Sequence, residues 1–189
     1  MPSGTSGAVA VLCAILFSSS SVQGQQAPAS PPTVRLGLGI GFASSGVGGE
    51  NLYAVGLVGA ALFGFPTGGR ADLALEINGQ FFKAAPPVGD EAYTAFYVLA
   101  GSNIRLGSAR RVFLRPSLGI VHRSWSGTEV VTETKTSFAM GIAVGSLARI
   151  GDGIGLGPEL YIRFSRADEI STTLIGLQIS FQPVGRLDR

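Results

Sequence analysis

A two-residue alternation of apolar and other side chains recurs along this chain from Thr33 to Phe181. Between Val112 and Ile120 every second residue is apolar, and the same rhythm runs from Ile154 to Phe164. Successive side chains of a β-strand point to opposite faces, so a period of two indicates a strand with one apolar face. The residues between the apolar ones are mostly glycine, alanine, serine and an occasional charged group.

Eight segments carry this alternation, and eight is the smallest number of strands in a bacterial transmembrane barrel. The predicted fold is all-β: an eight-stranded, antiparallel, up-and-down transmembrane β-barrel. In the second segment Val55 and Leu57 are expected to point outward, and in the fourth segment Phe96 and Val98. In both segments the alternation is unclear, so which set of alternate residues (the parity of the strand) points outward is ambiguous. The expected strands are residues 34–43, 52–63, 71–81, 93–106, 112–124, 137–150, 154–164 and 172–181.

The N-terminal residues predict export. Residues 8–17 are an apolar run followed by serines and a small-residue site near Gly24, which indicates a signal peptide over residues 1–24. We expect a flexible lead-in at 25–32, the barrel at 33–181 and a periplasmic tail at 182–189. The single cysteine, Cys13, lies within the signal, so the mature chain would have no disulfide and no cysteine metal site. No metal and no cofactor are expected.

The charge content favours a membrane barrel over a soluble one. Only 14 % of residues are charged, against about 25 % in a typical soluble domain. A soluble lipocalin-like barrel would turn its apolar face inward and need a charged exterior, whereas the non-apolar face here is mostly small residues. The net charge of +2 is spread without a basic run, so no nucleic-acid partner is expected.

A few charged residues lie on the face predicted to point inward. Buried charges are tolerable when they are paired, so we predict a plugged interior rather than an open channel. Its centre is expected at Glu76, Glu159, Arg115 and Arg163. The predicted interior groups are Arg35, Asp72, Glu76, Arg105, Arg115, Arg123, Arg149, Glu159 and Arg163.

The predicted connections alternate in length and charge. Those after the first, third, fifth and seventh strands are longer and acidic, and we assign them to the cell exterior. Aromatic residues gather near these loops and predict a girdle at the membrane interface. They are Phe42, Tyr53, Phe81, Tyr93, Phe96, Trp125, Phe138 and Phe164.

The alternating closing segment from Gly176 to Phe181, which ends on an aromatic residue, resembles the C-terminal assembly signal of small outer-membrane barrels. Over residues 34–181 the chain is similar to the OmpA-like and OmpX-like eight-stranded family. The resemblance implies an outer membrane of a Gram-negative-type bacterium, contact with membrane lipid and lipopolysaccharide, handling by the assembly machinery, and a monomeric state.

One constellation raises a catalytic hypothesis. His122 and Ser124 share the outward face of the fifth strand, with Glu129 in the following loop. This arrangement resembles the outer-membrane lipid A deacylases, which use a histidine, a serine and a glutamate, and it implies ester hydrolysis. The alternative is an interfacial histidine without a chemical role. Three functions therefore remain: a structural or surface-interaction barrel, a small pore, and a lipid A-modifying hydrolase.

Overall fold

The computed structural model describes residues 31–47, 50–67, 69–84, 92–107, 111–126, 133–150, 153–167 and 170–183. The described residues form strands joined by short connections, and they include no helix long and apolar enough to cross a membrane. The strands are β1 (Thr33–Val47), β2 (Glu50–Pro66), β3 (Ala71–Ala84), β4 (Ala92–Leu106), β5 (Val112–Ser126), β6 (Glu133–Ser146), β7 (Ala148–Ile150), β8 (Ile154–Ala167) and β9 (Ile170–Pro183).

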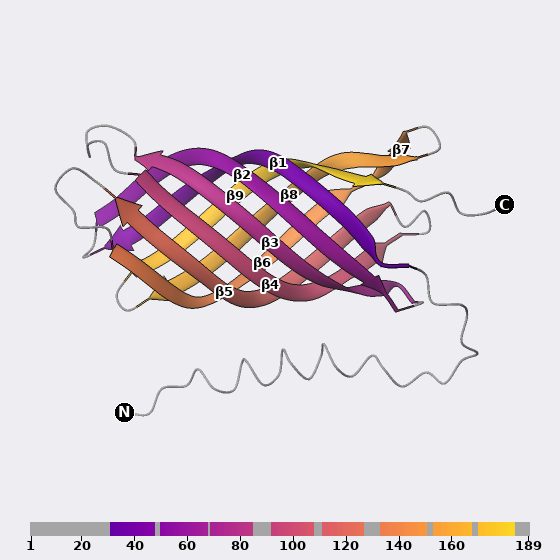
Figure 1. Ribbon diagram of the computed structural model, residues 1–189, viewed down its shortest axis with the longest axis horizontal. Coiled ribbons are helices and arrows are strands. Elements are labelled where there is room, and N and C mark those ends of the chain that lie inside the picture. Colours follow the sequence, from indigo (N-terminus) through magenta and orange to yellow (C-terminus); the bar gives the residue numbers. More distant parts are fainter. Residues whose placement is uncertain are drawn as a thin grey trace, which may run out of the picture.

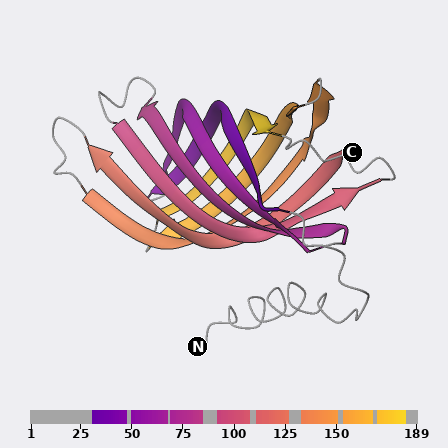
Figure 2. The same ribbon diagram turned by 45° about the vertical axis from the view of Figure 1, so that its right-hand side comes forward.

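The strands close into a single antiparallel barrel (Figures 1 and 2). The order is β6-β5-β4-β3-β2-β1-β9-β8-β7, and an additional β6–β8 pairing joins the two ends. β6 and β7 keep one register against β8 and are one strand interrupted at Leu147. That register sets Ser146 opposite Pro158, which has no N–H to donate, so the ladder breaks there. The predicted eight-stranded barrel is therefore confirmed, with its sixth strand in two pieces.

The pairing register fixes the tilt of the strands. Followed from strand to strand once around the barrel, the partners of Arg35 lead back to β1 at Ser45, ten residues further along. With ~3.3 Å per residue and ~4.8 Å between strands, this stagger gives a tilt of about 40°. Eight strands at that tilt enclose an interior that side chains can fill.

Several strands extend beyond the predicted segments. β1 runs to Val47 and β2 starts at Glu50, so the predicted long loop after the first strand is a two-residue connection. β8 and β9 are likewise separated only by residues 168–169. The expected alternation of loop lengths is therefore wrong at two of the four positions. The reason is that backbone hydrogen bonds do not need apolar side chains, so strand pairing continues through residues 44–47 on β1 and 165–167 on β8 after the apolar alternation has ended.

The two faces of the wall differ as the alternation predicted. Leu38 is 76 % exposed on the outside, whereas Val58 is 1 % exposed within. On β4, the outward Phe96 and the inward Asn103 settle the ambiguous parity. The outward apolar residues cover every long strand and include Val34, Leu36, Leu38, Ile40, Phe42, Val55, Leu57, Leu73, Leu75, Phe81, Ile120, Met140, Ile142, Leu160, Ile175, Leu177 and Ile179.

Candidate functional site

The centre of the barrel holds a ring of alternating charge. Arg35 on β1, Glu76 on β3, Arg115 on β5 and Glu159 on β8 come from every second strand around the wall. Arg115 Nη2 lies 3.1 Å from Glu76 Oε2 and also pairs with Glu159, while Arg35 Nη1 lies 3.6 Å from the second oxygen of Glu159. All four side chains are buried. Each cation thus has an anion beside it, which offsets the cost of removing both from water.

A fifth charged residue, Arg163, lies on β8 four residues after Glu159 and also joins this ring. Its guanidinium pairs with Glu76 and lies 4.2 Å from the ring centre of Tyr161 and 5.1 Å from that of Tyr97. Arg35 lies 4.4 Å from the ring centre of Phe113 in the same way. Aromatic faces attract such cations. These inward aromatic residues were not predicted as partners, although their strand parity places them on the interior face.

The remaining predicted interior residues divide into two groups. Asp72 pairs with Arg105 near the end of the barrel where β3 begins. Arg123 is fully buried at the opposite end and donates to Thr172 and Ser137. Arg149 was placed inside by the sequence, but it lies exposed on β7, which pairs only with β8 and extends past the enclosed part of the barrel.

Above the charged ring, apolar side chains share the lumen with buried polar ones such as Asn78, Gln80 and Arg123. A buried apolar cluster lies mainly in the half nearer the β3–β4 and β5–β6 connections and includes Tyr97 and Tyr161, whose rings also face Arg163. The sequence predicted mainly small residues on this face. The cluster consists of Ala43, Val58, Phe82, Tyr93, Ala95, Tyr97, Leu99, Val121, Ala139, Ala143, Tyr161 and Leu174. The interior is therefore packed with side chains in both halves.

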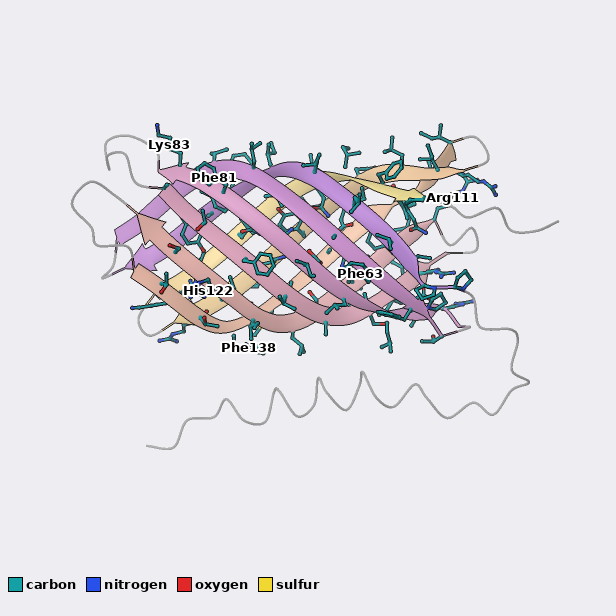
Figure 3. The ribbon with its side chains drawn as sticks, in the orientation of Figure 1. Phe63, Phe81, Lys83, Arg111, His122 and Phe138 are labelled. Carbon is teal, nitrogen blue, oxygen red and sulfur yellow. The ribbon has the colours of Figure 1, made fainter. Side chains whose placement is uncertain are left out.

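On the outside, five phenylalanines form a belt at one height. At about 40° tilt each residue along a strand climbs about 2.5 Å, and each step to the next strand adds about 3 Å. On this geometry the belt residues lie within about 3 Å of one level, on five different strands. They are Phe42, Phe81, Phe96, Phe138 and Phe164, each exposed. Figure 3 shows Phe81 and Phe138 on the outer surface.

The predicted girdle needs one correction. Tyr93 points into the lumen, where it is 9 % exposed and its ring centre lies 5.6 Å from that of Phe82. The side chains of Tyr53 and Trp125 lie outside the described residues.

The opposite edge of the apolar surface carries Phe63, Phe65 and Phe181. From Phe65 to Phe81 the outward apolar band is about 23 Å tall on the same geometry, close to the ~25 Å band of outer-membrane barrels. Exposed cationic residues stand beyond both edges: Lys83 at one end and Arg111 at the other (Figure 3).

The candidate catalytic residues lie just above the belt. His122 is exposed, and its Nδ1 is 2.9 Å from Oγ1 of Thr136, the residue opposite it on β6. Ser124 is half-buried one step further along the outer face, and Glu129 lies outside the described residues. Within the described part of the chain, no group of three or more His, Cys, Asp or Glu side chains could hold a metal ion. The described geometry is an exposed histidine hydrogen-bonded to a threonine.

Comparison with known proteins was informative at the level of structure alone. No family model and no curated protein matches the sequence. Neisserial surface protein A superimposes with a TM-score of 0.60 at 12 % identity, over 82 % of this chain and 99 % of that one. Ail, the attachment invasion locus protein of Yersinia pestis, gives 0.56 at 12 % identity, over 81 % and 99 %. This chain has the fold of the small eight-stranded outer-membrane β-barrels. The identities are too low to carry more than the fold.

Proposed function

We propose that this protein is an outer-membrane barrel of a Gram-negative-type bacterium with a structural or surface-interaction role and without catalytic activity. The observation that carries the proposal is the outward apolar band of membrane height, bounded by phenylalanines, around an interior filled by paired charges. Hydrocarbon is the environment that stabilises such a surface, and a closed barrel leaves no backbone edge unpaired within it.

The predicted signal peptide at residues 1–24 supports export and lies outside the described residues. With the N-terminal side of the barrel in the periplasm, the β1–β2, β3–β4, β5–β6 and β8–β9 connections face the cell exterior. Lipopolysaccharide and membrane lipid would surround the wall, and the outer-membrane assembly machinery would insert it. Closure engages both edges of the sheet, which supports a monomer.

The surface role takes its support from the fold neighbours. One is named a surface protein and another an attachment invasion locus protein. The four connections at the outer end are the parts of this chain that an external partner could reach.

A small pore is the second candidate, and the filled lumen argues against it. Arg115 joins Glu76 and Glu159 across the interior, with the apolar cluster above them. Planar-bilayer recording separates the two functions. The structural proposal predicts no steady single-channel conductance from the purified protein, while a reproducible open level would favour the pore.

Cell fractionation combined with gel mobility tests the main proposal. We expect the protein in the outer-membrane fraction, extracted only by detergent, and migrating differently before and after boiling because a closed barrel resists unfolding by detergent. Recovery from the periplasm as a monomer that stays dissolved without detergent would refute the proposal.

A further inference from the structure

The ladder between β6 and β8 is incomplete at its end nearer the phenylalanine belt. The ladder between these strands begins at the pair Ala139–Ser165, although β8 continues to Ala167 and β6 already starts at Glu133. The last two residues of β8 pair only with β9. The two strands therefore separate above Ala139, at the height of the phenylalanine belt.

A groove of about 260 Å³ opens at this separation. Phe138, Met140 and Phe164 form its apolar part, and all three point outward into the expected hydrocarbon. Arg166, Thr172 and Thr173 line its other end. The groove surface is mostly apolar, and the exposed Arg166 stands at its upper end, at the height at which a lipid passes from chain to headgroup.

A second cation lies behind the same end. The guanidinium of the fully buried Arg123 donates to Thr172 Oγ1 on β9 at 2.8 Å and to Ser137 Oγ on β6 at 2.8 Å. It therefore links β6 to β9 from within the lumen, at the level at which β6 and β8 separate. Arg123 and Thr172 are buried, so a ligand in the groove would reach the exposed Arg166 at the rim.

We infer that this groove binds one membrane lipid of the outer leaflet through a phosphate-bearing headgroup, with an acyl chain against Phe138, Met140 and Phe164. The inference rests on the proposed function, which places the groove in the outer leaflet. The cationic end complements a phosphate, because arginine and hydroxyl groups are strong donors to phosphate oxygens. Pockets for small-molecule ligands usually have volumes of about 300–1,000 Å³. The groove is smaller, so it would contact only the part of the lipid where the acyl chain joins the headgroup.

The same belt offers an internal comparison. Phe42 on β1 lies at the same height, but the β1–β2 ladder is continuous there, with Phe42 opposite Val55. Phe42 therefore lies on a part of the barrel where the neighbouring strands stay paired, and no arginine lies next to it on β1. Lipid contact there is expected to be non-specific.

Methionine labelling gives a direct readout of the groove. The full chain has two methionines, Met1 and Met140, and Met140 lines the groove. The protein in detergent micelles, labelled with ¹³C at the methionine methyl groups, is titrated with dihexanoyl phosphatidic acid, dihexanoylglycerol or inorganic phosphate. We expect a saturable shift of the Met140 resonance with phosphatidic acid and a weak, non-saturating response to the other two. Equal responses to the lipid with and without phosphate, or to phosphate alone, would overturn the inference.

Two arginine variants complete the test. Arg166→Gln is expected to weaken the phosphatidic acid titration about five- to tenfold, the effect of losing one charge-assisted contact. Arg111→Gln removes an exposed cation at the opposite end of the barrel and should leave the titration unchanged. Equal effects of the two variants would contradict a local site. A sample that keeps its heat-dependent gel shift but shows no Met140 response refutes only the lipid groove, whereas loss of the gel shift in the unmodified chain refutes the proposed function itself.

Discussion

Arg163 and Glu76 form an ion pair between opposite walls of the barrel. Arg163 is on β8 and Glu76 is on β3, which lie half-way round the closed sheet from each other. Both side chains are almost completely buried. A contact of this kind ties the two sides of the cylinder together and blocks the lumen at the level of the charged ring.

Neutralising Glu76 should therefore be costly. Glu76→Gln leaves Arg115 and Arg163 without one of their carboxylates in a buried position, and we expect the free energy of unfolding to fall by about 3 kcal/mol. Urea titration of the folded barrel in detergent or lipid measures it. Asp72→Asn is the matched control, because the Asp72–Arg105 pair is partly exposed and should contribute about 1 kcal/mol or less. Similar losses from both variants would contradict a charged ring as the main support of the interior.

Tyr161 and Gly176 give a steric test of the same interior. They face each other across the β8–β9 ladder, and a Cβ added at Gly176 would lie 2.1 Å from the phenol oxygen of Tyr161. Gly176→Ala should destabilise the barrel by about 2 kcal/mol, because the ring must move within a packed lumen. Gly79→Ala, where an added Cβ meets nothing within 4 Å, should change stability by less than about 0.5 kcal/mol. If the two substitutions prove equally harmful, packing of Tyr161 against Gly176 is not what requires the glycine.

The alternation alone was enough to predict which residues face inward at the centre of the barrel. Glu76, Arg115, Glu159 and Arg163 stand between the apolar residues of the alternation and so fall on the inward face, and the structure brings all four together. Which carboxylate meets which arginine could not be predicted, because partners across the lumen depend on the ten-residue stagger. The stagger depends in turn on the pairing of every strand.

The failures have local causes. The expected outer girdle includes Tyr93, yet counting by twos along β4 from the outward Phe96 places Tyr93 inside, so the sequence does carry this signal. Arg149 has the parity of an inward residue, but β7 extends beyond the last residue of β6 that pairs with β5. No enclosed lumen surrounds its side chain there, so Arg149 is exposed. The tight β1–β2 hairpin was missed because strand pairing there is carried by backbone, without apolar side chains to mark it.

The hydrolase hypothesis makes its own prediction through His122. His122 is hydrogen-bonded to Thr136 on the outer face, and the proposed non-catalytic role predicts that His122→Ala leaves the acyl-chain masses of lipid A unchanged in cells that produce the protein. Mass spectrometry of extracted lipid A provides the measurement, with cells lacking the protein as the reference. A change in acyl content that depends on the protein and disappears with His122→Ala would establish catalysis.

Depth-dependent cost of a charge on the outer wall tests the central claim most directly. Leu38 points outward near the middle of the apolar band, and Leu106 points outward about 4 Å beyond its edge at Phe65 on the register geometry. In lipid vesicles, Leu38→Arg should lower the free energy of unfolding by about 2–4 kcal/mol and Leu106→Arg by about 1 kcal/mol or less. A membrane-spanning wall predicts that difference. Equal and negligible losses at both positions would mean that Leu38 faces water and that the wall does not span a bilayer.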